Sequence, residues 1–194
     1  MQACELRATH LSCRRGDRMV FRNLSFAARA GNALQIAGPN GAGKSSLMRI
    51  CAGLLRPAEG TVSAQSGIGL LDERAALDPD LPLATALRFF ARLDRCETVT
   101  DFALELGLDD LLDVPVRYLS TGQRRRAALL RLHNQRAAIW LLDEPLNGLD
   151  TDGQALLLRM IENHRANGGL CLVASHQPMG LPDLGMLHLP DFAP

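Results

Sequence analysis

The sequence has almost no lysine. Its 194 residues include 21 basic and 21 acidic side chains, and Lys44 is the only lysine among them. A compact ammonium and a planar guanidinium are not interchangeable, because they differ in shape, hydration and hydrogen-bond geometry. If arginine replaces lysine wherever a plain positive charge suffices, the remaining lysine marks a position that a guanidinium cannot fill. Lys44 is therefore the first candidate functional residue.

Other absences exclude whole classes of protein. The net charge of zero argues against a chain whose main task is to bind nucleic acid through its phosphates. No stretch reaches the roughly 18 consecutive apolar residues of a membrane-spanning helix, and the N-terminus lacks the pattern of a signal peptide, so we expect a cytosolic chain. The five cysteines are scattered without a CxxC pair. They are typical of reduced, partly buried thiols and not of a disulfide framework or a zinc site.

The apolar pattern predicts an α/β fold. Residues 1–30 alternate as short antiparallel strands do, and residues 59–72 indicate one or two more strands. Residues 34–37 indicate a compact strand, and the uninterrupted apolar runs at 138–142 and 170–174 are typical of a parallel sheet buried on both faces. We expect helices over about residues 45–52, 84–93, 99–106, 123–132 and 152–167. This predicts one domain, with a core of residues 1–72 and 133–194 and a helical insertion over about residues 73–132.

A glycine-rich segment follows the strand predicted at 34–37. Residues 38–46 read GPNGAGKSS and match G-x-x-x-x-G-K-[ST]. In such a loop, backbone N–H groups and the N-terminus of the next helix surround phosphate oxygens. Lys44 would reach the β- and γ-phosphates of a nucleotide, and the Ser45 hydroxyl would ligate Mg²⁺. The predicted phosphate-binding residues are Gly38, Pro39, Asn40, Gly41, Ala42, Gly43, Lys44, Ser45 and Ser46.

Two carboxylates end the apolar strand predicted at 138–142. Asp143 suits a Mg²⁺ ligand, and Glu144 suits a general base that activates an attacking water. His176 follows the strand at 170–174, at the same carboxyl edge of the sheet, where it could contact a γ-phosphate. An ordinary solvated strand end would explain these residue types equally well, but the upstream P-loop favours the functional interpretation.

The segment LSTGQ at residues 119–123 has two interpretations. Ser120 and Gln123 have the spacing of a capping box that opens a helix. The same helix N-terminus could offer Ser120 and the Gly122 N–H to a phosphate, and the motif alone does not decide between the two. We expect the arginines at 124–126 to form a solvated face or a partner contact, since the net charge is zero.

The order of these motifs, P-loop, LSTGQ, strand-end Asp-Glu, Leu149-Asp150 and Ser175-His176, closely resembles that of the ATP-binding cassette (ABC) ATPases over essentially the whole chain. The resemblance implies a P-loop NTPase core with an N-terminal antiparallel β subdomain and an inserted helical subdomain. It also implies that residues 119–123 are the ABC signature, Asp150 the D-loop aspartate and His176 the switch histidine. ATP with Mg²⁺ would lie between the P-loop of one copy and the signature of the other, Gln123 included, in a head-to-tail homodimer.

Three positions depart from the family pattern, and one of them is Leu146, where many members have threonine. Where the family has an adenine-stacking aromatic, this chain has Arg15, whose planar face could stack on a base. Where the family has a Mg²⁺-contacting glutamine, the nearest counterpart is Glu73.

Among ABC ATPases, the chain resembles the CcmA family, the ATP-binding subunit of the cytochrome c maturation, or haem exporter, system. The resemblance rests on its small size, on YLSTGQRRR at 118–126 and on SHQPMGLP at 175–182. It implies a peripheral subunit on the cytoplasmic face of the bacterial inner membrane, bound to integral-membrane permease subunits and linked to haem delivery to a periplasmic chaperone. Neither nucleic-acid binding nor direct haem binding is expected. The alternatives are an ABC exporter of a lipid or another small molecule, and a soluble non-transport ABC ATPase.

Overall fold

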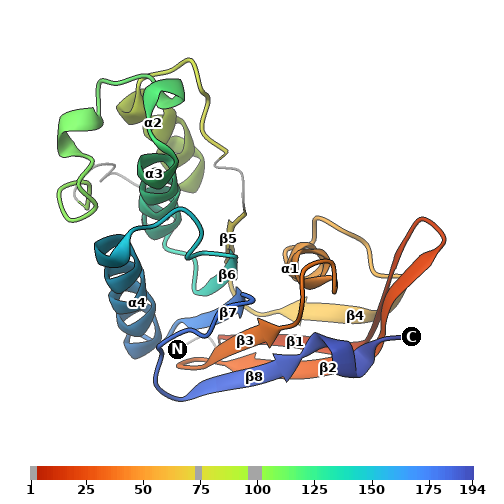
Figure 1. Cartoon of the computed structure of the whole chain (residues 1–194). Coiled ribbons are helices and arrows are strands. Elements are labelled where there is room, and N and C mark those ends of the chain that lie inside the picture. The colour runs from red at the N-terminus through yellow and green to blue at the C-terminus, as the bar shows by residue number, and fades with distance from the viewer. Residues whose placement is uncertain (1–3, 73–75, 96–101) are drawn as a thin grey trace. The chain divides into compact units, whose positions relative to one another are not determined.

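The computed structural model describes residues 4–72, 76–95 and 102–194, which pack into two units (Figure 1). The first unit contains the described residues up to Asp72 together with Ala137–Pro145 and Ile161–Pro194. The second contains the described residues between Asp72 and Ala137, together with Leu146–Met160.

A three-stranded antiparallel sheet forms the start of the first unit. Its strands β1 (Glu5–Arg15), β2 (Arg18–Arg29) and β4 (Glu59–Ala64) lie in the order β2-β1-β4. The antiparallel strands expected in residues 1–30 are present, but they are two long strands and not several short ones. The register of β1 shifts between Ala8 and Leu11 and again before Cys13, and these bulges explain the broken alternation of the sequence.

The second sheet of this unit is parallel and has five strands. Its order is β5-β6-β7-β3-β8, with β5 at Ile68–Leu71, β6 at Ile139–Asp143, β7 at Leu170–Ala174, β3 at Ala33–Ala37 and β8 at Leu184–His188. Every residue of the neighbouring strands β6 and β7 is buried, as their continuous apolar sequences predict. The edge strand β8 and the short 3-10 helix η3 (Leu189–Phe192) were not predicted, because Gly185 weakens the strand pattern and β8 depends on its pairing with β3.

The main core of the first unit joins the two sheets to helix α1 (Lys44–Cys51). Its fully buried members come from β1, β2, β3, α1, β6 and β7, and include Leu6, Leu11, Phe21, Leu24, Ile36, Leu47, Met48, Ile139, Leu141 and Leu172. Four of the five cysteines, Cys4, Cys13, Cys51 and Cys171, are buried and free. Burial raises the pKa of the Cys51 thiol to about 12, so this side chain behaves as a small apolar group. Cys96 lies outside the described residues.

The second unit is helical. It contains α2 (Leu83–Asp94), α3 (Thr121–Asn134) and two short 3-10 helices, η1 (Asp109–Leu111) and η2 (Val116–Tyr118). Helix α4 (Thr151–Ala166) begins in this unit and continues into the first after Met160. The helix expected over residues 99–106 is wrong for its described part, because residues 102–106 form turns. Its remaining residues, 99–101, lie outside the described chain.

Candidate functional site

The glycine-rich loop connects the end of β3 to the start of α1. Gly43 precedes the helix with a φ of 106°, and a Cβ atom there would lie 2.4 Å from Val20 Cγ1. Only glycine fits this position, because both the backbone conformation and the space exclude a side chain. Helix α1 has no acidic residue in its first turn, so its positive N-terminus is available to an anion. This is the geometry that the sequence motif predicts for phosphate binding.

Lys44 is buried in this loop, with 5% of its surface exposed. Its Nζ atom donates hydrogen bonds to Gly38 O at 2.9 Å and Pro39 O at 3.3 Å. It also forms an ion pair with Glu144 Oε1 at 3.4 Å. The three protons of an ammonium group match these three oxygen atoms. Lys44 therefore links the loop to the end of β6.

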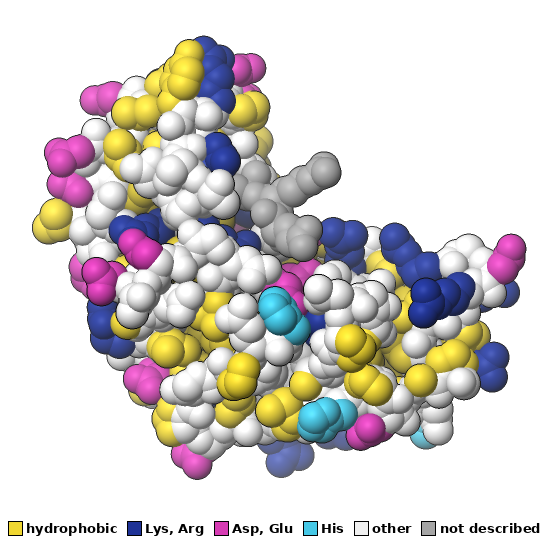
Figure 2. Space-filling model, viewed as in Figure 1, with side chains coloured by type: hydrophobic (Ala, Val, Ile, Leu, Met, Phe, Trp, Pro, Cys, Tyr) yellow, Lys and Arg dark blue, Asp and Glu magenta, His cyan; other side chains and the backbone are white. Residues whose placement is uncertain are grey.

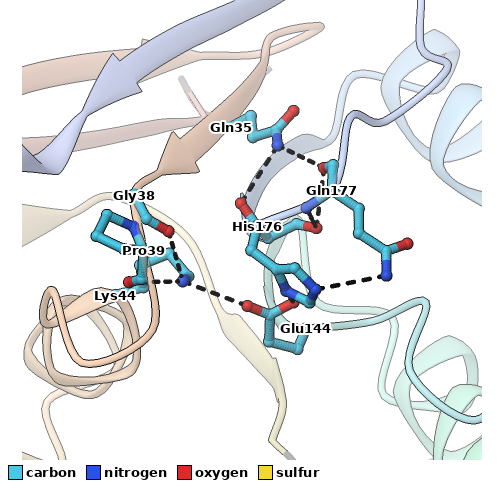
Figure 3. A network of polar contacts seen from close by, with 8 residues as sticks. Gln35, Gly38, Pro39, Lys44, Glu144, His176 and Gln177 are labelled. Carbon is cyan, nitrogen blue, oxygen red and sulfur yellow. Dashed lines mark hydrogen bonds and ion pairs between the residues drawn. The ribbon is translucent and has the colours of Figure 1, made fainter.

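Glu144 connects the lysine to His176 (Figure 3). Its backbone adopts a positive φ of 44° directly after β6, which turns the chain at the edge of the sheet. Its Oε2 atom lies 2.9 Å from His176 Nδ1, and because a carboxylate can only accept, the shared proton belongs to Nδ1. His176 Nε2 faces Gln177 Nε2 at 3.5 Å. The structure thus brings together three residues predicted for catalysis, Lys44, Glu144 and His176.

The residues predicted to hold Mg²⁺ have suitable chemistry. Asp143 is the last residue of β6 and is 2% exposed, and Ser45 lies in the first turn of α1. Both offer oxygen atoms, the ligands that Mg²⁺ prefers. Within the described residues, no group of three His, Cys, Asp or Glu side chains could hold a metal ion. Mg²⁺ commonly combines one or two carboxylates with substrate phosphates, so this donor set fits. Glu73 lies outside the described residues.

Arg15 lies at the end of β1, where the hairpin to β2 begins. It is exposed and pairs in register with Arg18. Figure 2 shows basic side chains gathered over this hairpin. Two residues earlier, Cys13 is buried in the same core cluster as Leu47 and Met48 of α1. Arg15 therefore lies at the end of a strand that packs against the helix after the glycine-rich loop.

The residues predicted to form the signature belong to the second unit, where they open α3. Ser120 Oγ accepts a hydrogen bond from Gln123 N at 3.2 Å, and Gln123 Oε1 accepts one from Ser120 N at 2.8 Å. The predicted capping box is therefore present. The cap uses Ser120 Oγ only as an acceptor, so its O–H can still donate to another group. Capping and phosphate binding are compatible at this residue.

Asp150 lies close to the same helix. Its carboxylate accepts two hydrogen bonds from Arg126 Nη2, at 2.6 and 2.8 Å, and a third from Gly153 N at 2.9 Å. The Arg126 guanidinium, with the Gly153 N–H, lowers the pKa of Asp150 below its ordinary value. Gly148, two residues before Asp150, lies close to Gly122 in the first turn of α3. A Cβ on Gly122 would lie 3.0 Å from Gly148 O.

The arginines at 124–126 do not form the expected solvated face, and the alternative, a partner contact, stays a prediction. Arg125 is buried, and Arg124 donates to Leu119 O at 2.6 Å. Arg126 forms the ion pair with Asp150. The zero net charge described the whole chain and held no information about neighbours in space.

Sequence reasoning missed two residues of the network in Figure 3, Gln35 and Gln177. Gln35 lies in the middle of β3 and is 3% exposed, and its side-chain amide donates to the carbonyls of Ser175 and Gln177. A signal was available, because Gln35 is a polar residue inside the apolar run Leu34–Ala37, which the fold buries on both sides. A buried amide needs partners, so its position indicated a specific role.

The chain is similar in sequence to a known protein family and to named proteins from other bacteria. The ABC transporter family model matches residues 21–147. A cytochrome c biogenesis ATP-binding export protein CcmA from Novosphingobium aromaticivorans is 55% identical over 194 residues, which cover 100% of both chains. Proteins of the same description from Sphingopyxis alaskensis and Zymomonas mobilis are 54% and 48% identical, over 91% and 94% of this chain and 92% and 83% of theirs.

Solved structures share the fold at lower identity. An ABC transporter ATP-binding protein from Pyrococcus furiosus superimposes with a TM-score of 0.83 at 22% identity, covering 98% of this chain and 100% of that one. A dimeric ATP-binding cassette in a post-hydrolysis state, bound to ADP and Pi, gives a TM-score of 0.76 at 21% identity, covering 89% of this chain and 88% of that one. These likenesses support the α/β fold predicted from the sequence.

Proposed function

Because the chain belongs to the ABC transporter family and is 55% identical to a CcmA protein over its full length, we propose that it is the ATP-hydrolysing subunit of a membrane complex for cytochrome c maturation. In this role it would couple ATP hydrolysis to haem export and delivery to a periplasmic haem chaperone. The observation that carries the ATPase role is the contact of Lys44 and His176 with the two oxygens of one carboxylate, that of Glu144.

Each of these residues has a distinct task in the proposed reaction. Lys44 binds the β- and γ-phosphates of ATP. The phosphate oxygens compete with Glu144 for the third proton of the Lys44 ammonium group. Glu144, released from the lysine, accepts a proton from the water that attacks the γ-phosphorus. His176 orients the Glu144 carboxylate and lies next to the γ-phosphate. Mg²⁺, held by Ser45 and Asp143, would neutralise charge on the phosphates.

The second unit contributes through a partner copy in the proposal. Ser120, Gly122 and Gln123 contact the γ-phosphate held by the P-loop of the other copy in an ATP-bound homodimer, and Asp150 lies at the same interface. Residues of about 73–132 thus act as a helical subdomain that presents the signature. The Ser120 hydroxyl proton supports this role, because the capping box leaves it available. Arg15 is proposed to stack on adenine.

Within the described residues, no helix is long and apolar enough to cross a lipid bilayer. We place the chain on the cytoplasmic face of the bacterial inner membrane, as a peripheral subunit bound to integral-membrane permease subunits. The CcmA description of the similar proteins supports this assignment. No part of the proposed mechanism requires the chain to bind haem itself.

The test of the mechanism is Glu144→Gln, which keeps the size of the side chain and removes its basicity. We expect this variant to bind ATP and to hydrolyse it at least about 100-fold more slowly, since a positioned base contributes about that factor or more. Lys44→Ala is the comparison variant and should lose ATP affinity itself. The measurements are ATP binding and steady-state phosphate release. Near-normal hydrolysis by Glu144→Gln would exclude Glu144 as the base.

The test of the cellular role is a deletion strain complemented with the same variants. Haem-stained c-type cytochromes should be restored by the natural chain and not by either variant. If the deletion leaves c-type cytochromes normal and the chain co-purifies with a lipid- or drug-exporter permease, the ATPase serves another exporter. If it does not sediment with membranes at all, a non-transport ABC role is indicated.

A further inference from the structure

We propose that Gln35 is a positioning residue for ATP hydrolysis, which fixes the backbone on both sides of His176 relative to the phosphate loop. This proposal rests on the function proposed above. It starts from the burial of an amide side chain in an interior strand of the parallel sheet. Strand β3 pairs with β7 on one side and β8 on the other, with Gln35 opposite Val173 and Met186.

The contacts of Gln35 define the orientation of its amide. Its Nε2 atom donates to Gln177 O at 2.8 Å and lies 3.4 Å from Ser175 O. Both partners are backbone carbonyls, which only accept, so the nitrogen and not the oxygen of the amide must face them. One side chain therefore holds the residues immediately before and after His176 (Figure 3).

The turn of residues 175–177 is closed by a second set of hydrogen bonds. Gln177 N donates to Ser175 Oγ at 3.0 Å, and Ser175 Oγ donates to Gln177 O at 3.0 Å. Ser175 N also faces Ile36 O of β3 at 3.4 Å. Ser175 is 1% exposed, whereas the His176 side chain is 41% exposed. The exposed histidine thus projects from a turn that begins at the buried Ser175 and is bonded to β3 at Ile36 O and at the Gln35 side chain.

Gln35 lies on the strand that leads directly into the phosphate loop. Strand β3 ends at Ala37, and the phosphate loop follows directly at Gly38. The same short strand therefore holds Lys44 through the loop and His176 through Gln35, while Glu144 N is fixed by Ala174 O at 2.8 Å. Displacing a catalytic group by about 1 Å can cost as much as 100-fold in rate. Gln35 fixes the position of His176 relative to the phosphate loop without contacting the nucleotide.

The experiment uses the full chain, purified with the membrane subunits that accompany it. Gln35→Leu removes both hydrogen bonds and keeps a side chain of similar size. We expect kcat to fall about tenfold with KM for ATP within about twofold, because the residue acts on the hydrolytic step and not on binding. Gln65→Leu, an exposed glutamine of the same unit, is the matched control and should retain the kcat of the natural chain. Gln35→Met is the second variant if Gln35→Leu does not fold.

Two further measurements separate positioning from a general loss of stability. In a His176→Ala background, Gln35→Leu should change kcat less than about twofold, because its effect passes through His176. Amide hydrogen exchange should accelerate at Gln177 and stay unchanged in β6 and β7. An additive double variant, or a Gln35→Leu chain with normal kcat, would overturn the positioning role and leave the ATPase intact. A natural chain that releases no phosphate would overturn the proposed function together with this inference.

Discussion

Lys44 makes all its polar contacts with oxygen atoms in a confined space. Its Nζ atom contacts two loop carbonyls and one carboxylate, and only 6% of its side chain is exposed. A guanidinium is planar and wider, and its five N–H groups spread over a fork that three converging oxygens cannot satisfy. The single lysine of the sequence therefore has a structural reason, because a compact charge must fit among backbone oxygens at this position.

The prediction at the residue scale is that Lys44→Arg loses ATP binding although its charge is unchanged. We expect the dissociation constant to rise at least about tenfold, because the larger group displaces the loop or leaves N–H groups unpaired. Isothermal titration with ATP measures the change. The control is Arg56→Lys, the reverse substitution at an exposed arginine of the same unit, which should bind normally. Normal affinity in Lys44→Arg would show that charge alone is required.

At the scale of secondary structure, most elements follow from local sequence and a few do not. Strand β7 matches its predicted residues, and α2 and α3 extend the predicted helices by one to two residues at each end. Local apolar runs and the Ser120 capping box were sufficient for these. The edge strand β8 was missed because it owes its existence to pairing with β3, with Ala33 opposite Leu184, and its own sequence carries no alternating pattern.

The prediction at this scale concerns Gly60 in β4, next to a bulge of β1. Gly60 has a φ of 83°, and a Cβ there would lie 2.4 Å from the carbonyl oxygens of both Thr9 and His10. Gly60→Ala should therefore lower the free energy of unfolding by about 3 kcal/mol, through backbone strain and a collision with backbone atoms.

Gly31→Ala provides the control for that experiment. Gly31 has nearly the same φ, 81°, but nothing within 4 Å of the corresponding Cβ position. It should cost only the strain of the positive φ, about 1 kcal/mol. Chemical denaturation of both variants measures the difference. Equal losses would mean that β1 and β4 can separate to admit the methyl group.

At the scale of the whole molecule, the proposed site is divided between the two units. The phosphate loop, Asp143, Glu144 and His176 lie in the first, and the capping box of α3 and the Asp150–Arg126 ion pair lie in the second. A head-to-tail homodimer would use both, with each nucleotide contacting the first unit of one copy and the second unit of the other.

The prediction at this scale is that two inactive variants restore each other. Lys44→Ala lacks the phosphate lysine, and Ser120→Asp keeps an N-cap acceptor but repels phosphate. An equimolar mixture should recover about a quarter of the natural ATPase rate, since half of the dimers are mixed and each of these has one intact site. Phosphate release by each variant alone is the control. An inactive mixture of stable, dimerising variants would indicate that the signature serves the nucleotide of its own copy.

The sequence alone determined the features that depend on short spacings. The phosphate loop, the strand-end pair Asp143-Glu144 and the capping box each occupy only a few consecutive residues, so local geometry was sufficient to predict them. The tertiary structure decided which distant residues meet. Gln35 and Gln177 are separated by 142 positions and Arg126 and Asp150 by 24, and no local pattern encodes these pairs. They depend on strand order and on the path of the chain between elements, since a buried amide or a charge finds its partner only after the sheets and helices have packed.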